Sequence, residues 1–180
     1  MSIRTSAVLL ALAFLAPDPT LSQVYLTKAG ALNLHFAQSD SIQRRTVYLT
    51  EQQVTTIEQK ARATIDSRVI TYYVARVDGK NTGYAFFDRQ TVRTMPVVYM
   101  VVVDPDTTVR AVEILAFHEP EDYLPTERWL AQYEGTALHD DLWLKRGIQN
   151  VVGATLSAQT LTQGVRRVLA LFEVAVAGGG

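Results

Sequence analysis

The middle of the chain carries the hydrophobic pattern of β-strands. Residues 69–77 and 82–88 are rich in aromatic and β-branched side chains, and the turn Asp78-Gly79-Lys80-Asn81 separates them. Two such runs around an Asp-Gly turn predict a β-hairpin. Residues 97–103 are apolar almost throughout, which predicts a central strand covered on both faces. Residues 108–117 carry apolar side chains on alternating faces, so they predict a fourth strand of an antiparallel meander.

Helical patterns precede this strand-rich region. Thr27 stands before the segment 28–36, whose apolar side chains recur at helical spacing. Residues 46–49 read as a short strand. Thr50 followed by Gln53 forms a capping box, which predicts a polar surface helix through about residue 62.

The longest helix is predicted from residue 156 onward, after a short helix at 127–133. Its apolar side chains form a core-facing stripe: Leu161, Val165, Val168, Leu169 and Phe172. Gly164 interrupts this helix at a cost of about 1 kcal/mol relative to Ala, which indicates close packing at that point. The predicted fold class is therefore α+β, an antiparallel β-sheet meander packed against a few helices, with a long C-terminal helix.

The first residues have the pattern of a secretory signal peptide. Arg4 precedes the apolar run 7–16, which is followed by prolines and the small residue Ser22. Ten apolar residues are too few for a membrane-spanning helix, which needs about 20. We expect cleavage near Gln23 and export to the periplasm, with an uncleaved membrane anchor as the alternative. The expected division of the chain is a signal peptide at 1–22, an N-terminal helical and strand extension at 23–67, a functional domain at 68–177 and a flexible tail at 178–180.

Composition excludes several functions. The 180 residues contain 17 basic and 18 acidic side chains, mixed along the chain, so there is no electrostatic footprint for nucleic acid. The absence of cysteine rules out thiolate chemistry and a cysteine-linked lipid anchor. His35, His118 and His139 fall on separate predicted elements, without the spacing of metal ligands. No P-loop, nucleophile elbow or dinucleotide-binding glycine motif precedes a helix.

The start of the long helix has the chemistry of an anion site. Gly153 and Ala154 are small enough to allow close approach of a ligand, and Thr155 is expected at the N-cap position. The helix carries no acidic side chain before Glu173, so a phosphate could interact with the positive end of its dipole. The alternative is an ordinary surface helix capped by Thr155.

Three segments together carry a family resemblance. The run VGATLSA at 152–158, the GVRR of the following helix and the upstream pattern FHEP-x-x-YLP-x-x-RW resemble the FMN-binding domain family over about residues 83–171. That family includes the periplasmic flavin subunits of the sodium-pumping NADH:quinone reductase and of the Rnf complex, and also stand-alone exported flavoproteins.

The resemblance implies a specific flavin site. In the family, a flavin transferase attaches FMN from FAD to a threonine as a phosphoester, and the matching residue here is Thr155. The resemblance places Gly153, Ala154, Leu156 and Ser157 beside it and matches His118 with Glu119 to a segment near the flavin ring. Side chains of the loop after Pro120 are the candidates to lie against that ring: Leu124, Tyr123 and Trp129.

Two positions depart from the family motif. The motif usually has Asp six residues before the acceptor threonine and Ser or Thr before the glycine, whereas this chain has Gln149 and Val152 there. Two modes of FMN binding therefore stay open, a covalent link through Thr155 and binding without a covalent bond. The corner at 119–122 lacks the Glu-Thr pair and glycines common in the ion-pump subunits, which favours the stand-alone exported type.

These observations lead to one functional hypothesis and one alternative. The hypothesis is an exported FMN-binding electron-transfer flavoprotein with no substrate pocket of its own, hence a redox carrier or subunit rather than a self-contained enzyme. Its partners would be redox proteins, including a membrane-bound electron-transfer complex, and a flavin transferase if the cofactor is covalently linked. The alternative is an exported α+β binding or assembly module without a bound flavin.

Overall fold

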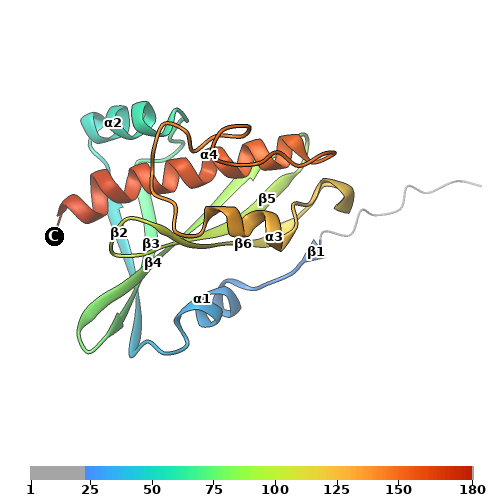
Figure 1. Ribbon diagram of the computed structural model, residues 1–180. Helices are drawn as coiled ribbons and strands as arrows, with labels where there is room; N and C mark the ends of the chain where they lie inside the picture. The colour runs from blue at the N-terminus through green and yellow to red at the C-terminus, as the bar shows by residue number, and fades with distance from the viewer. Residues whose placement is uncertain (1–22, 180) are drawn as a thin grey trace, which may run out of the picture.

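One antiparallel sheet organises the part of the chain that the computed structural model describes, residues 23–179 (Figure 1). The predicted signal peptide at 1–22 lies outside the described residues. The strands follow the spatial order β1-β6-β5-β4-β3-β2. Their bounds are β1 Gln23–Val24, β2 Ser41–Tyr48, β3 Val69–Val77, β4 Lys80–Thr91, β5 Pro96–Val103 and β6 Val109–Phe117.

The four strands from β3 to β6 form the predicted meander. Each pairs antiparallel with the next, and β5 lies between β4 and β6 with most of its side chains buried. The hairpin turn between β3 and β4 uses Asp78 and Gly79 at φ of 49° and 74°, a conformation that Asp and Gly adopt more readily than other residues. The prediction of an α+β fold with a central, doubly covered strand is therefore confirmed.

The helices lie on both faces of this sheet. Their bounds are α1 Lys28–Phe36, α2 Glu51–Ala61, α3 Glu127–Leu130 and α4 Thr155–Leu171. Short 3-10 turns cover Glu121–Tyr123 (η1), Ala131–Tyr133 (η2) and Ala177–Gly179 (η4), and a π-helical segment covers Phe172–Val176 (η3). Figure 1 shows α2 and α4 over one face of the sheet and α1 against the other.

Each face of the sheet has its own hydrophobic core. Under α4 the core includes Tyr99, Val101 and the buried side of the helix, and it contains all five apolar positions of the predicted stripe. On the other face α1 buries Leu32 and Phe36 against a smaller apolar cluster. The sheet is thus covered on both sides, by α4 and α2 on one face and by α1 on the other.

The segment 23–67 is tied to the same sheet. Its strand β2 pairs with β3 along its full length, and β1 pairs with the end of β6. Both predicted helix caps are present, because the Thr27 hydroxyl accepts from the Gly30 amide and Thr50 with Gln53 forms the capping box. Within residues 23–179, no helix is both long enough and apolar enough to cross a membrane.

Candidate functional site

A cavity of about 180 Å³ lies at the start of α4. Three parts of the chain line it: the first turn of α4 with the residues just before it, the loop between β4 and β5, and the end of η1. The lining residues are Val92, Arg93, Tyr123, Gly153, Ala154, Thr155, Leu156 and Ser157. Five of the eight sequence-predicted site residues therefore meet in one place.

The helix begins one residue earlier than the cap prediction required. Gly153 takes a φ of 86°, Ala154 is the N-cap residue, and Thr155 is the first residue of the helix. The Thr155 hydroxyl donates to the Val151 carbonyl at 3.3 Å and accepts from the Asn150 amide group at 3.1 Å, so it does not cap a backbone amide. The predicted role of Thr155 as N-cap is wrong, and no side chain caps this helix start.

The uncapped start of α4 is suited to an anion. A helix leaves its first amide groups without partners inside the helix, and they carry the positive end of the dipole. The first turn of α4 contains no acidic side chain. Among the described residues, the Ser157 hydroxyl is buried without a hydrogen-bond partner, and Ser157 lines the cavity with only 1% of its surface exposed. Burying a hydroxyl without a partner is costly, so Ser157 supplies a free hydrogen-bonding group to whatever occupies the cavity.

Glu119 fixes the opposite wall of the cavity. Its carboxylate accepts from three successive backbone amides, those of Arg93 at 3.1 Å, Thr94 at 2.8 Å and Met95 at 2.9 Å. These backbone bonds, led by those from Thr94 and Met95, lower the pKa of Glu119, and the nearby Arg93 charge contributes as well. The resemblance places Glu119 with His118 near the flavin ring, which stays a prediction; in the structure Glu119 holds the loop between β4 and β5.

Arg93 brings the one cationic side chain that lines the cavity. Its guanidinium carbon lies 5.2 Å from the centre of the Tyr123 ring, which is a cation–π distance. The ion pairs within residues 23–179 do not include Arg93. The cavity therefore combines helix amides, a buried hydroxyl, an arginine and an aromatic ring.

The remaining predicted residues lie outside this lining. His118 is half-buried, and its Nδ1 lies 3.1 Å from the Pro96 carbonyl. Leu124 packs at the margin of the larger core. Trp129 is buried and donates from Nε1 to the Gln149 carbonyl at 2.6 Å, so its ring belongs to the core. Of the three side chains proposed to lie against the flavin ring, only Tyr123 faces the cavity.

Comparison with known proteins gives one result at the level of the fold. No protein-family model matches the sequence, and no curated protein matches it. Five chains of solved structures match, including NqrC of Shewanella oneidensis, with a TM-score of 0.50 and 16% sequence identity. The match covers 81% of this chain and 83% of NqrC. The chain shares its fold with NqrC.

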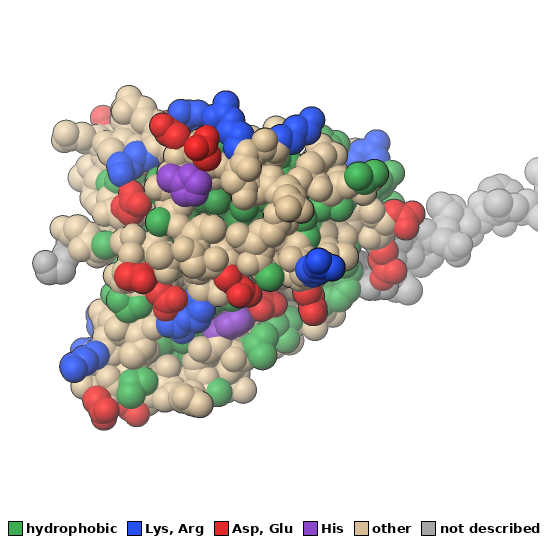
Figure 2. Space-filling view, in the orientation of Figure 1, with side chains coloured by type: hydrophobic (Ala, Val, Ile, Leu, Met, Phe, Trp, Pro, Cys, Tyr) green, Lys and Arg blue, Asp and Glu red, His purple; other side chains and the backbone are tan. Residues whose placement is uncertain are grey.

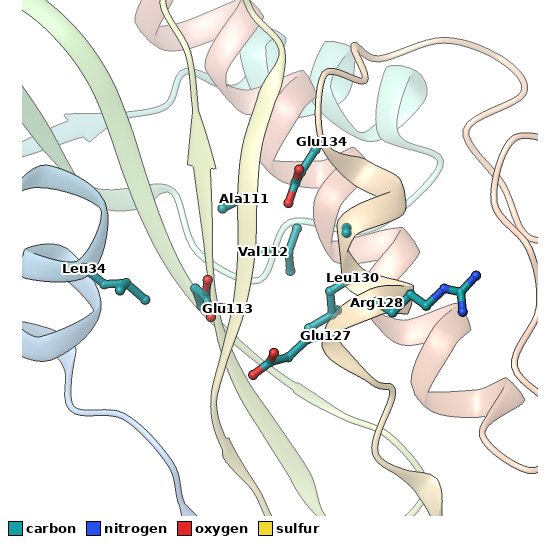
Figure 3. A pocket seen from close by; sticks show the side chains of 9 residues that line it. Leu34, Ala111, Val112, Glu113, Glu127, Arg128, Leu130 and Glu134 are labelled. Atoms are coloured by element: carbon teal, nitrogen blue, oxygen red, sulfur yellow. The ribbon is translucent and has the colours of Figure 1, made fainter.

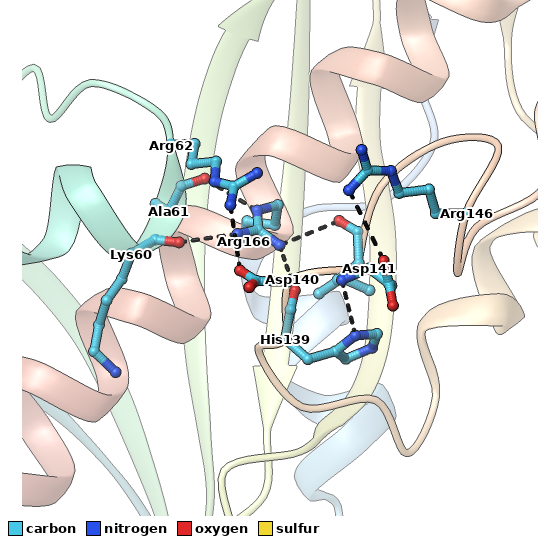
Figure 4. A network of polar contacts seen from close by, with 9 residues as sticks. Lys60, Ala61, Arg62, His139, Asp140, Asp141, Arg146 and Arg166 are labelled. Carbon is cyan, nitrogen blue, oxygen red and sulfur yellow. Dashed lines mark hydrogen bonds and ion pairs between the residues drawn. The ribbon is translucent and has the colours of Figure 1, made fainter.

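Arg166 and Arg167 of α4 belong to the GVRR segment of the family resemblance, and both make contacts inside the fold. Arg166 is 1% exposed and donates to four backbone carbonyls (Figure 4). Two of them, of Lys60 and Ala61, lie at the end of α2, and two, of His139 and Leu142, lie in the segment between η2 and α4. It also lies 4.5 Å from the centre of the Trp143 ring. Burial, together with the nearby Arg62 charge, lowers its pKa. This side chain therefore joins α4 to the end of α2 and to the segment between η2 and α4.

Arg167 makes a second internal contact, with the sheet. Its guanidinium pairs with Asp88 of β4 and donates to the Tyr99 hydroxyl of β5 at 3.4 Å. Tyr99 in turn donates to Asp88 at 2.8 Å. Gly164 makes room for this arrangement, because a Cβ atom at that position would lie 1.8 Å from the Tyr99 hydroxyl oxygen. The prediction of close packing at Gly164 is confirmed.

A larger hollow of about 490 Å³ lies between α1 and α3, away from the start of α4. Figure 3 shows Glu113, Glu127 and Glu134 around this hollow, and Arg128 of α3 lines it as well. Glu113 is also paired with His35 at 2.9 Å. Figure 2 shows acidic side chains across the middle of this face. The described residues contain no group of three or more metal-ligating side chains suited to a metal ion.

Sequence reasoning missed Val92 and Arg93 as parts of the site. They come from a short loop between two strands, and nothing in the local pattern links that loop to residues 153–157. The available signal was Glu119, since a buried carboxylate needs hydrogen-bond donors. Those donors are the backbone amides of Arg93, Thr94 and Met95, in the loop that forms this wall of the cavity.

Proposed function

We propose that this protein is an FMN-binding electron-transfer flavoprotein whose cofactor phosphate binds at the start of α4. The observation that carries the proposal is the Ser157 hydroxyl, buried without a partner in a cavity at an uncapped helix start. A phosphate matches these groups, because it accepts several hydrogen bonds and carries the charge that the helix dipole favours. Two observations support the proposal: the chain shares its fold with NqrC, and its sequence motifs resemble those of the FMN-binding domain family.

The cavity dimensions favour an electron carrier over a self-contained enzyme. At about 180 Å³ the cavity is smaller than the 300–1,000 Å³ or so typical of pockets that enclose a drug-sized ligand. It has room for the phosphate and part of the side chain of FMN, so most of the flavin ring would remain outside. Leu156 and Val152, exposed by 48% and 98%, offer apolar surface beside it. A bound flavin would supply the redox chemistry, and an accessible ring suits electron exchange with a partner protein.

Thr155 is the candidate for a covalent link. Its side chain is exposed, and its hydroxyl bonds only to Asn150 and Val151 among the described residues. Gln149 and Val152 are also exposed, so a transferase would meet both departures from the family motif. We propose that these residues determine whether FMN is tethered or held reversibly.

The test is to express the protein with its own export machinery and a flavin transferase, and to ask whether flavin stays with the denatured chain. Flavin retained by the wild type and lost in Thr155→Ala supports the phosphoester. Release on denaturation supports reversible binding. A protein that is colourless and stays so after incubation with FMN contradicts the flavoprotein proposal and favours a flavin-free binding or assembly module.

We propose further that the protein is exported and acts as a stand-alone carrier or as a subunit of a membrane-bound electron-transfer complex. The support is the sequence at 1–22 and the family resemblance. Fractionation of cells, with a cytoplasmic and a periplasmic marker, tests the export. Co-purification from solubilised membranes distinguishes the subunit from the carrier.

A further inference from the structure

The loop between β4 and β5 places a single cation at the mouth of the cavity. Arg93 and Val92 line the cavity from this side, opposite the first turn of α4. The Arg93 side chain is exposed and lies against Tyr123. Because no ion pair within residues 23–179 includes Arg93, its charge is available to an anionic ligand.

The Glu119 carboxylate holds the loop that carries Arg93 through backbone hydrogen bonds. The Glu119 carboxylate, only 9% exposed, accepts from the amides of Arg93, Thr94 and Met95, and the Val92 amide donates to the Met95 carbonyl at 3.0 Å. Bonds from amides to a carboxylate are charge-assisted and stronger than neutral ones. Three of them on successive residues fix the backbone from which the Arg93 side chain extends.

We infer that Arg93 is the residue by which this site recognises the phosphate of its flavin, and that Glu119 is the positioning residue that presents Arg93 to the cavity. The inference rests on the proposed function and adds selectivity to it. The helix amides and Ser157 would contact the phosphate from one side, and the Arg93 guanidinium from the other. An arginine matches a phosphate in both charge and geometry. The site should therefore prefer FMN to riboflavin, which has the same ring but no phosphate.

The experiment measures the dissociation constants of FMN and riboflavin by flavin fluorescence, using protein produced without a transferase. We expect Arg93→Gln to weaken FMN binding by about tenfold to a hundredfold, the range for a hydrogen bond to a charged group, while riboflavin binding changes by less than about threefold. Arg93→Lys should retain part of the preference, because it keeps the charge but not the planar fork. Arg128→Gln is the matched control, since Arg128 is exposed and is not among the residues that line the α4 cavity.

Glu119 is tested by the same ratio of affinities, which a purely structural role would not change selectively. Glu119→Ala should lower the preference for FMN over riboflavin at least threefold. Glu119→Gln keeps an acceptor oxygen and should restore most of that preference. Glu121→Gln, two residues away on an exposed position, should leave the preference unchanged.

Inorganic phosphate, followed by amide chemical shifts of residues 155–157, separates this inference from the proposed function. If the wild type binds neither flavin, the proposed function fails. Saturable phosphate shifts that disappear in Arg93→Gln would still support a phosphate role for Arg93. An unchanged FMN-to-riboflavin ratio in Arg93→Gln overturns the role of Arg93, and so does phosphate binding that is absent or insensitive to Arg93. An unchanged ratio in Glu119→Ala overturns the positioning role.

Discussion

Replacing Gly164 by Ala should destabilise the protein, although alanine is the better helix former. Gly164 lies in α4 where the helix crosses β5. A Cβ atom there would lie 1.8 Å from the Tyr99 hydroxyl oxygen and 2.6 Å from its Cζ. Tyr99 is fully buried, and its hydroxyl is held by Asp88 at 2.8 Å, so the ring has no free space to enter. Either the helix or the tyrosine must move.

The expected cost follows from three effects. Overpacking a dense core costs about 1–3 kcal/mol. Displacing the Tyr99 hydroxyl from Asp88 leaves buried polar groups poorly paired, which costs about 1–3 kcal/mol more. Helix propensity returns about 1 kcal/mol. The net loss should be about 1–5 kcal/mol, and each kcal/mol lowers the melting temperature of a domain of this size by about 2–4 °C.

Urea denaturation followed by circular dichroism measures this loss. Gln159→Ala, an exposed change on the same helix, is the control and should alter the free energy of unfolding by less than about 0.5 kcal/mol. In a Tyr99→Leu background, Gly164→Ala should cost less, because the opposing side chain is shorter and the two changes are coupled. A Gly164→Ala protein as stable as the wild type, or more stable, would refute the packing argument.

Three further predictions concern the flavinylation motif, the buried Arg166 and the carboxylate of Glu119. Gln149→Asp with Val152→Thr should raise the fraction of chains that retain flavin after denaturation when a transferase is present, read by mass spectrometry; an unchanged fraction contradicts the motif argument. Arg166→Met should lower the free energy of unfolding by about 2–4 kcal/mol by leaving buried carbonyls unpaired, whereas Arg62→Met, which loses only an exposed ion pair at 3.3 Å, should cost less than about 1 kcal/mol. The pKa of Glu119 is lowered in the folded state, so its carboxylate should stabilise the fold fully at pH 7. This contribution, measured as the difference in free energy of unfolding between the wild type and Glu119→Ala, should decline as the pH falls below about 4.3, the usual pKa of glutamate, toward the lowered pKa. A difference that stays constant down to pH 3 would rule this out.

Local patterns predicted the elements whose signals are short-range. The hairpin with Asp78 and Gly79, the capping box at Thr50 and the apolar stripe of α4 each lie within a few residues of sequence. Strand β2 was predicted only at 46–49 but extends over Ser41–Tyr48. As an edge strand with an exposed, polar sequence, it lacks the alternation that reveals a half-buried strand.

Of the residues that line the cavity, the sequence predicted those at the start of α4 but not those of the loop between β4 and β5. Residues 153–157 carry a local signal, a small-residue turn before a helix, and they do line the cavity. Arg93 reaches the same cavity from a loop about 60 residues earlier in the sequence. That loop is shaped by long-range bonds to Glu119, and no periodicity records such bonds. The cap prediction at Thr155 was wrong for a local reason, because the positive φ of Gly153 lets the helix begin at Thr155 itself.

The two departures from the family motif, Gln149 and Val152, are not among the residues that line the cavity. Gln149 and Val152 both have exposed side chains, and Gln149 is held through its backbone, by the Gln132 side chain and the Trp129 indole. The groups suited to a phosphate lie elsewhere, on Ser157, on Arg93 and on the first amides of α4. A change in the residues that a transferase would read therefore leaves these donors in place. Without the covalent link, only charge and hydrogen bonds would retain the phosphate. This is the role inferred for Arg93.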